Sequence, residues 1–282
     1  MDSDDEKLKG EKVEGLKSET TLPLFNSSTL PLPAHSVRVE VRGLRKSYAG
    51  QQVLKGIDLS VERGEIFVIM GPSGSGKSVL LKHIIGLELP DEGQILIEGE
   101  SILTPGVMDK YRLAMVFQSG ALLNSLTVGE NVGLYLSEHR LKTAGEIDRI
   151  TDEKLEFLGL RNVKHRSPSE LSGGMKKRVA IARALVIDPQ LILYDEPTSE
   201  LDPLMTVTIG KEILDLKHRI HVTSIVVTHD RDLAFGVADR MAMMYDGNLI
   251  AVGLPEQLRH NRDPIIQKFL TADFNLNDKE PA

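Results

Sequence analysis

Short runs of apolar residues divide this chain at intervals that suit a parallel sheet covered by helices. Each run is apolar at consecutive positions, which is typical of strands buried on both faces. Amphipathic stretches at about 203–219 and 231–238 lie between three of the runs and favour helices there. The pattern predicts an α/β fold with a mostly parallel sheet. The apolar runs are 66–70, 113–117, 191–194, 224–228 and 241–245.

Strict alternation of apolar and polar residues marks a second kind of strand near the start. Residues 37–41 and 57–61 alternate with a period of two, so one face is buried and the other faces solvent. A turn at 48–50 separates them, and residues 94–98 indicate another half-exposed strand. These segments predict an N-terminal antiparallel β region, and residues 248–253 predict a short edge hairpin.

A helical period replaces the strand pattern between Thr127 and about Leu160. Its apolar residues recur at helix-like spacings, and Gly145 and Gly159 interrupt it. We expect an all-helical insert, at about 119–165, between two halves of the sheet domain. The recurring apolar residues are Val128, Val132, Leu134, Leu136, Ile147, Ile150, Leu155 and Leu158.

Composition divides the chain into three parts. Residues 1–36 run from a Lys-, Glu- and Asp-rich stretch into one rich in Pro, Ser, Thr and Leu, without a sustained apolar period. This composition predicts a disordered N-terminal tail, with a docking motif at 22–25 as the alternative. Residues 37–255 form the predicted folded domain, and residues 256–282 a C-terminal helix with a polar tail.

Charge and composition disfavour or exclude several classes of function. The net charge of −7 and the pI near 5.7 disfavour binding through bulk electrostatics to nucleic acid, so no nucleic-acid partner is expected. The absence of cysteine excludes disulfides, thiol nucleophiles and cysteine metal sites. No stretch approaches the roughly 18 apolar residues of a membrane span, and the acidic start differs from a signal peptide. If the protein works at a membrane, we expect a partner to hold it there.

A glycine-rich loop separates the apolar run 66–70 from an apolar helix that is expected to begin at Lys77. Strand, glycine loop and helix in this order form the P-loop pattern, in which backbone N–H groups cradle phosphates. Lys77 would reach the β- and γ-phosphates, and the Ser78 hydroxyl would hold Mg²⁺. A chance glycine turn is the alternative. The loop residues are Gly71, Pro72, Ser73, Gly74, Ser75, Gly76, Lys77 and Ser78.

Two carboxylates, Asp195 and Glu196, follow the buried run 191–194. At the C-terminal end of a strand, where α/β sheets place their ligands, Asp195 would lie beside Mg²⁺. Glu196 could polarise a water molecule that attacks the γ-phosphate. Taken alone, the pair could equally be a strand end solvated by acidic residues.

A third motif, Leu171-Ser172-Gly173-Gly174-Met175, precedes a helix expected from Lys176 to Val186. A serine and two glycines at a helix N-terminus make a second anion site. Together with the P-loop and the two carboxylates, this motif resembles the signature of ATP-binding cassette (ABC) proteins. The resemblance covers about residues 38–255, with the motifs in the expected order.

The resemblance to ABC proteins implies an ATPase with a P-loop NTPase (RecA-like) fold that uses ATP and Mg²⁺. It implies a homodimer of cassettes, in which Ser172, Gly173 and Gly174 close on the nucleotide of the partner. Gln118 would link Mg²⁺ and water to the helical insert, and His229 would contact the γ-phosphate. Tyr48 would stack on adenine, although a packed strand-end aromatic is the alternative. The implied catalytic residues are Glu196, His229, Lys77 and Gln118, and the implied metal ligands are Ser78, Gln118 and Asp195.

One position departs from the family pattern. In Ser199-Glu200-Leu201-Asp202, the segment called the D-loop, Glu200 stands where the family usually has a small residue. Its carboxylate would add negative charge near the implied dimer interface.

The spacing of the motifs excludes several relatives. One P-loop excludes chains with two cassettes, and the 95 residues from Lys77 to Ser172 leave no room for a long coiled coil. Among single-cassette subunits, the chain is similar to the MlaF/Mkl-type ATPases of MCE-protein lipid systems. The traits are Ser-Gly-Ala-Leu after Gln118, Met175 in place of Gln or Glu, and the segment 263–270 ending in Phe-Leu.

This finer resemblance implies a subunit at the cytoplasmic side of the inner (cell) membrane. It would power transport of lipid, in the first place phospholipid, through a separate integral-membrane permease and an MCE-domain protein. Two alternatives stay open. One is the ATPase of a polar-solute importer, and the other is a cassette without a transport role, such as the ATPase of an iron–sulfur assembly scaffold.

Overall fold

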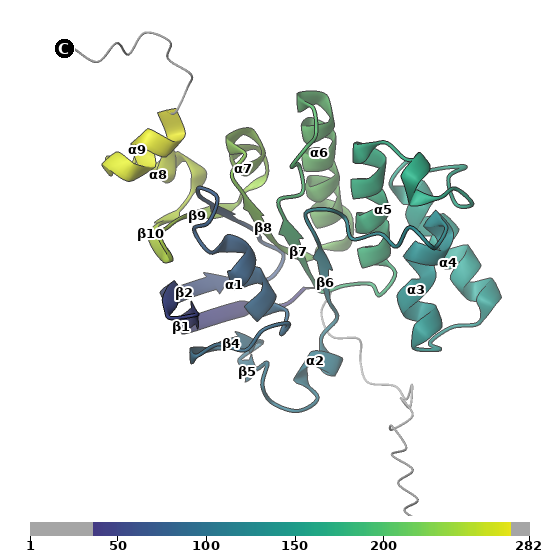
Figure 1. Ribbon diagram of the computed structural model, residues 1–282, viewed down its shortest axis with the longest axis horizontal. Helices are drawn as coiled ribbons and strands as arrows, with labels where there is room; N and C mark the ends of the chain where they lie inside the picture. Colours follow the sequence, from purple (N-terminus) through teal and green to yellow (C-terminus); the bar gives the residue numbers. More distant parts are fainter. Residues whose placement is uncertain (1–35, 272–282) are drawn as a thin grey trace, which may run out of the picture. The chain divides into compact units, whose positions relative to one another are not determined.

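The computed structural model describes residues 36–271 and shows two sheets accompanied by helices (Figure 1). The predicted disordered tail at 1–36 lies outside the described residues except for Ser36, and with it lies the alternative docking motif. The end of the predicted C-terminal tail, residues 272–282, also lies outside them.

A six-stranded, mostly parallel sheet forms the centre of the fold, as predicted. Its strands are β3 (Ile66–Met70), β6 (Leu113–Val116), β7 (Leu191–Asp195), β8 (Thr223–Thr228), β9 (Arg240–Tyr245) and β10 (Asn248–Gly253). Their order is β10-β9-β3-β8-β7-β6, and every neighbouring pair is parallel except the edge hairpin of β9 and β10. Because β3, β7 and β8 are buried along their whole length, their sequences are uninterrupted apolar runs rather than alternating ones.

The predicted N-terminal antiparallel region forms a second sheet. Its strands are β1 (Val39–Tyr48), β2 (Gln51–Val61), β4 (Glu92–Ile97) and β5 (Glu100–Ser101), in the order β2-β1-β4-β5. The first two strands extend well beyond the alternating segments, up to a turn at Ala49 and Gly50, which both have positive φ. Much of this extension is polar, and its buried apolar residues Leu44 and Leu54 are too widely spaced to give an alternating pattern in the sequence.

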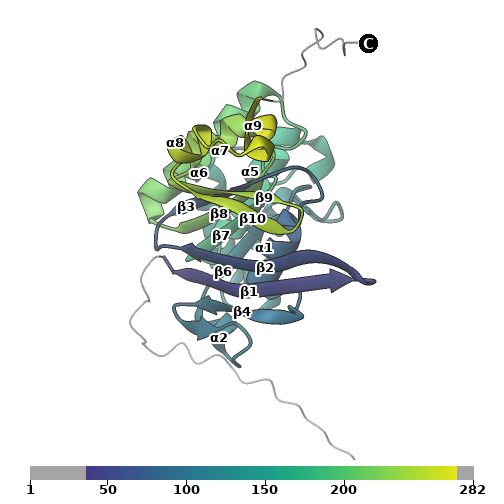
Figure 2. The ribbon, with the colours of Figure 1, turned by 90° about the vertical axis from the view of Figure 1, so that its left-hand side faces the viewer.

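Helices and the second sheet enclose two cores on opposite faces of the central sheet (Figure 2). Successive side chains of a strand point to opposite faces, so β3 contributes to both cores. Phe67 and Ile69 belong to the core shared with the antiparallel sheet. Ile66, Val68 and Met70 belong to the other. The first core includes α1 (Lys77–Ile84) and α2 (Val107–Lys110), and the second includes α5 (Gly173–Leu185), α6 (Pro203–Ile220), α7 (Arg231–Val237), α8 (Pro255–Arg259) and α9 (Pro264–Thr271).

The insert contains the helices α3 (Val128–Glu138) and α4 (Ala144–Phe157) and the 3-10 turn η1 (Pro168–Glu170). Thr127 and Thr143 cap the two helices in capping boxes, each with a glutamate three residues later. The helix break therefore lies just before Ala144, and the expectation that Gly145 interrupts the insert was wrong. Gly159 follows the end of α4 at φ +66°, a conformation that favours glycine.

Buried side chains of the insert are continuous with the core of the central sheet. Val132 and Leu155 belong to the same cluster as Val68. A Cβ on Gly133 would lie 2.6 Å from Ile147 Cγ2, so the close approach of α3 and α4 depends on this glycine. The boundaries at 37–255 and about 119–165 stay predictions. Within residues 36–271, no helix is long and apolar enough to cross a membrane.

A small polar cluster lies inside the same core, where β7, α5 and α6 meet. The Tyr194 hydroxyl and Glu212 Oε2 are buried and have no hydrogen-bond partner within the described part of the chain. Arg178 Nε lies 3.8 Å from Glu212 Oε1, and Arg178 also donates to the Leu158 carbonyl at 3.3 Å. Burial raises the pKa of Glu212 to about 7; the charge of Arg178 opposes this rise and that of Asp215 adds to it.

We expect Glu212→Gln to flatten the pH dependence of stability. The folded-state pKa of Glu212 is raised above 4.5, so between about pH 4.5 and 7 the folded state holds more protons than the unfolded state. The free energy of unfolding therefore falls as pH rises through this window, by on the order of 3 kcal/mol in total. Urea unfolding at pH 5 and pH 8 measures this difference. Exposed Glu256→Gln is the control, and equal pH differences in wild type and Glu212→Gln would contradict the prediction.

Candidate active site

The glycine loop lies between the end of β3 and the start of α1. A Cβ on Gly71 would lie 2.1 Å from the Met244 carbonyl oxygen, so no larger residue fits without moving the backbone. Gly76 has φ +104° and would bring a Cβ to 3.0 Å from Met244 Cε. Ser73 and Gly74 are exposed in the loop. The loop therefore has the close-packed base and open tip that phosphate binding through backbone N–H groups requires.

Lys77, the first residue of α1, turns its side chain back over the loop. Its Nζ donates to the carbonyls of Gly71 at 2.9 Å and Pro72 at 3.1 Å. The same Nζ lies 3.4 Å from Glu196 Oε1. Ser75 Oγ is buried beneath the loop and has no hydrogen-bond partner among residues 36–271. A cation and a carboxylate predicted to act on one phosphate are therefore in contact.

Ser78 and Asp195 are joined directly, across 117 residues of sequence. Ser78 Oγ donates to Asp195 Oδ1 at 2.6 Å. Burial raises the pKa of Asp195, and the charge of Glu196 adds to the rise, whereas the Ser78 bond lowers it. Both atoms are hard oxygen donors of the kind that Mg²⁺ takes. The described residues contain no cluster of three or more His, Cys, Asp or Glu suited to a metal. Mg²⁺ commonly takes one or two protein oxygens together with water and phosphate, and the Ser78–Asp195 pair fits that pattern.

Glu196 and His229 form the other half of the site. His229 Nδ1 lies 2.8 Å from Glu196 Oε2, and the His229 backbone N–H donates to the same oxygen at 3.2 Å. The Glu196 side chain is only 9% exposed, whereas that of His229 is 54% exposed. Glu196 has φ +46°, an uncommon conformation outside glycine, and its N–H donates to the Val227 carbonyl at 2.9 Å. The Glu196 backbone is thus held beside Val227, near the end of β8.

Sheet order explains why these residues meet. The strands β3, β8 and β7 are parallel neighbours, so their C-terminal ends lie at one edge of the sheet. The loop follows β3, Asp195 ends β7, and His229 follows β8 directly. Open α/β sheets bind ligands outside the C-terminal ends of their strands. The site therefore occupies the edge that this fold uses for ligands.

The signature segment differs slightly from its prediction. Helix α5 begins at Gly173 rather than Lys176, because Ser172 is its N-cap and accepts from the Met175 N–H at 3.4 Å. Gly173 and Gly174 therefore belong to the first turn of the helix. A Cβ on Gly174 would lie 2.6 Å from Met205 Sδ at the start of α6. Within residues 36–271, no hydrogen bond or ion pair joins this segment to the P-loop.

Gln118 and Tyr48, the remaining predicted site residues, contact partners outside the groups described so far. The Gln118 side chain is exposed just after β6, and its backbone carbonyl accepts a bond from Lys177 on α5. The Tyr48 hydroxyl bonds to Glu88, and burial together with this bond raises the pKa of Tyr48 to about 12. The Tyr48 ring is 40% exposed and lies beneath the ammonium of Lys46, 5.5 Å from its centroid. Its role against adenine stays a prediction.

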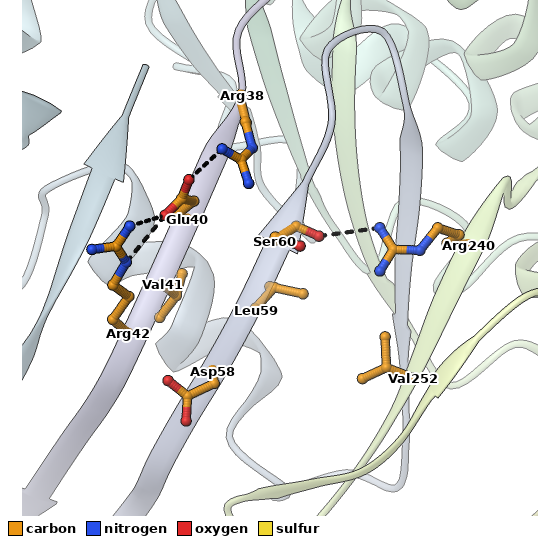
Figure 3. A pocket seen from close by; sticks show the side chains of 9 residues that line it. All are labelled: Arg38, Glu40, Val41, Arg42, Asp58, Leu59, Ser60, Arg240 and Val252. Atoms are coloured by element: carbon orange, nitrogen blue, oxygen red, sulfur yellow. Dashed lines mark hydrogen bonds and ion pairs between the residues drawn. The ribbon is translucent and has the colours of Figure 1, made fainter. Parts of the chain in front are cut away.

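A separate hollow of about 420 Å³ lies between β1, β2 and β10 and is lined by none of the predicted site residues (Figure 3). Most of its charged groups are already paired within the protein, and Asp58 accepts a hydrogen bond from the Gly43 N–H at 2.8 Å. Glu40 pairs with both Arg38 and Arg42, and Arg240 pairs with Glu65. We therefore place the candidate site at the glycine loop and not in this hollow.

Sequence reasoning missed Lys177, which contacts Ser199 at 3.2 Å and the Gln118 carbonyl. It also missed the bond of Thr198 to Asp230 at 3.2 Å. A lysine in the middle of an amphipathic helix carries no local signal of burial. Only the packing of α5 against two loops makes Lys177 a buried cation.

Glu200 is exposed and has φ +66°. We expect Glu200→Ala to raise the ATPase rate measured without a permease, because it removes negative charge near the implied interface between two copies. One exposed charge is worth roughly 0.5–1 kcal/mol, which corresponds to about a two- to fivefold rate increase. Steady-state phosphate release at increasing protein concentration measures this, with Glu92→Ala as the control. An unchanged rate at saturating protein would refute it.

Comparison with known proteins identifies the family. Residues 54–199 match the family model described as ABC transporter. The probable ribonucleotide transport ATP-binding protein mkl of Mycobacterium leprae is 40% identical over 84% of this chain and 69% of its own length. The intermembrane phospholipid transport system ATP-binding protein MlaF of Haemophilus influenzae is 38% identical over 86% of this chain and 95% of its own. The sulfate/thiosulfate import ATP-binding protein CysA of Synechococcus elongatus is 38% identical over 83% and 68%.

A solved structure gives the same answer. The dimeric ATP-binding cassette MJ0796, in a post-hydrolysis state with ADP and Pi, superimposes with a TM-score of 0.70 at 33% identity, covering 77% of this chain and 98% of that one. This confirms the predicted ABC ATPase fold. The chain belongs to the ABC transporter family and is an ATPase of the type represented by Mkl and MlaF.

Proposed function

We propose that this chain is the ATP-binding and ATP-hydrolysing subunit of a transporter for lipid, in the first place phospholipid. It would work through a separate membrane permease and an MCE-type protein, at the cytoplasmic face of the cell membrane. The observation that carries the proposal is the match with MlaF, which spans 95% of that protein. The Ser-Gly-Ala-Leu run at 119–122 and Met175 in the signature support the same assignment.

In the proposed mechanism the ATP phosphates lie in the glycine loop, where backbone N–H groups and the N-terminus of α1 stabilise their charge. Lys77 would then exchange its contacts with Gly71, Pro72 and Glu196 for phosphate oxygens. When the Lys77 ammonium moves away from Glu196, the Glu196 carboxylate becomes free to bind water. Tyr48 would stack on the adenine ring. The contacts of Lys77 with the Gly71 and Pro72 carbonyls support the shape of the loop.

Ser78, Asp195 and Gln118 are the proposed Mg²⁺ ligands. The 2.6 Å bond between Ser78 Oγ and Asp195 Oδ1 places two oxygen donors side by side. Bound Mg²⁺ would neutralise charge on the β- and γ-phosphates. Burial raises the pKa of Asp195, and a cation beside the carboxylate favours its ionised form.

Glu196 is the proposed general base. Its buried carboxylate would polarise the water that attacks the γ-phosphorus, while the bond to the bridging oxygen of ADP breaks. His229 holds the Glu196 carboxylate through two contacts to Oε2 and would also face the γ-phosphate. Lys77 would stabilise negative charge on the transferred group. Catalysis in this class consists mainly of positioning and electrostatic stabilisation.

Two copies of the chain would complete two such sites. Ser172, Gly173 and Gly174 form the N-cap and first turn of α5, and such a helix N-terminus can bind an anion. In the proposed homodimer this end closes on the partner's nucleotide. Closure would move Gln118 and the helical insert, and these would transmit the motion to the permease. ATP would drive the closure because it contacts the closed state more fully than the open one.

A polar-solute importer is the second candidate. The Mkl proteins are named for ribonucleotide transport and CysA for sulfate and thiosulfate import, at identities similar to that of MlaF. A cassette without a transport role is the third. The ATPase site would be the same in all three, so the partner decides between them.

A tagged full-length chain recovered from detergent-solubilised membranes tests the proposal, with mass spectrometry of both proteins and lipids. We expect a multi-span permease, an MCE-domain protein and bound phospholipid to co-purify. A permease accompanied by a solute-binding protein would favour the importer. Recovery without any permease would overturn the transport role, whereas the ATPase assignment would stand.

A further inference from the structure

Lys177 is a buried cation that the proposed mechanism does not yet use. It lies on α5, shortly after the signature glycines, and is 7% exposed. The next residue, Arg178, contacts the Leu158 carbonyl and Glu212, so the two neighbouring cations serve different parts of the fold. Lysine is almost never fully buried unless its charge is paired. The partners of Lys177 therefore indicate its role.

The ammonium of Lys177 joins two loops that are remote from it in sequence. It donates to the backbone carbonyl of Gln118, 59 residues earlier, and to Ser199 Oγ at 3.2 Å, 22 residues later. The N–H of Ser199 in turn donates to the carbonyl of Glu196 at 3.2 Å. Lys177 is thus one hydrogen-bonded residue away from the backbone of the proposed general base.

The charges of three carboxylates act on this ammonium. Burial lowers the pKa of Lys177, and the charges of Glu200, Glu196 and Asp195 act in the opposite direction, in that order of size. Two of these carboxylates belong to the proposed ATPase site. A neutral side chain of the same length would fill the space but would leave their repulsion uncompensated.

A second cation on the same helix strengthens the contact with the loop after β6. Arg183 donates to the carbonyls of Gly120 and Ala121, each at 2.7 Å. Helix α5 therefore holds residues 118–121 through two side chains. Of these two, Lys177 is the one that also reaches Ser199.

We propose that Lys177 is a positioning residue for ATP hydrolysis, which fixes the loops at Gln118 and Ser199 relative to the helix that carries Ser172. When α5 shifts as two copies close, the ammonium would carry both loops with it. Contact of the signature segment with the partner's nucleotide would thereby set the position of Glu196. The inference rests on the proposed role of Glu196 in hydrolysis.

Three substitutions of Lys177 distinguish the effects of its charge and hydrogen bonds from the effect of its packing. Lys177→Met keeps length without charge or donor, Lys177→Gln keeps a donor, and Lys177→Arg keeps both. Lys211→Met, which removes an exposed lysine from α6, is the matched control. ATP turnover is measured with the full chain, together with ATP affinity and thermal unfolding.

We expect Lys177→Met to lower kcat by about 10- to 100-fold, the scale of a small misplacement of catalytic groups. ATP affinity should stay within about twofold, because Lys177 contacts Gln118 and Ser199 and not the P-loop within residues 36–271. Lys177→Arg should recover kcat to within about threefold of wild type, with Lys177→Gln between the two. If Lys177 had only a structural role, its substitutions would change the unfolding temperature. They would not lower kcat in this order at an unchanged ATP affinity.

A wild-type kcat for Lys177→Met would overturn the inference, and so would equal losses in Lys177→Met and Lys177→Arg. If Lys177→Met does not fold, Ser199→Ala provides the second test, because it removes one partner and should lower kcat severalfold at unchanged ATP affinity. Glu196→Gln is assayed in parallel. Normal turnover in Glu196→Gln would contradict the proposed site itself, whereas an inactive Glu196→Gln beside a normal Lys177→Met would contradict this inference alone.

Discussion

Glu196→Gln should bind ATP and form the closed dimer but lose ATP turnover by about 10²- to 10⁴-fold, the usual contribution of a general base. The amide keeps the shape of the carboxylate but cannot accept a proton from water. Glu196 is buried and contacts both Lys77 and His229, so the isosteric change preserves the packing of all three residues. The loss should therefore be in kcat and not in ATP affinity.

Single-turnover phosphate release measures the effect, and size-exclusion chromatography with and without ATP follows dimer formation. Glu153→Gln, on the exposed face of α4, is the matched control. Wild-type turnover in Glu196→Gln would remove Glu196 from the role of general base. Loss of ATP binding would instead indicate that its pairing with Lys77 maintains the loop.

Ser172→Arg is expected to abolish ATP hydrolysis while a single chain still binds ATP. Ser172 lies at the N-cap of α5, where Ser172 Oγ accepts from the Met175 N–H. A guanidinium there would fill the anion site that the partner's nucleotide enters in the proposed dimer. Losing the cap itself costs only about 1 kcal/mol, so the fold should persist.

Binding of a fluorescent ATP analogue at low protein concentration reports on the monomer, and phosphate release at high concentration reports on the dimer. Ser169→Arg adds the same charge three residues earlier, in η1, and should behave as wild type. If Ser172→Arg loses monomer binding and hydrolysis together, then the signature serves the nucleotide of its own chain, and the head-to-tail dimer is refuted.

Motifs that are continuous in sequence were predictable because local chemistry defines them. The eight residues of the P-loop need glycine where the backbone approaches Met244, and the buried strand before them is a plain apolar run. The parallel sheet followed from the same runs. The polar extension of β1 and β2 and the exact break before Ala144 were not predicted, since neither leaves an apolar period.

By itself, the sequence determined the fold class and the phosphate loop, and it predicted roles for the two carboxylates at the end of β7 and for the second anion site, because each depends on neighbouring residues. Only the tertiary structure decided which distant groups touch. Parallel pairing of β7 and β8 brings Glu196 to His229, and that of β8 and β3 brings the loop beside them. The packing of α5 against two loops turns an ordinary helical lysine, Lys177, into a buried cation that joins those loops. Such contacts depend on strand order and helix packing, and these depend on the whole chain rather than on any one segment.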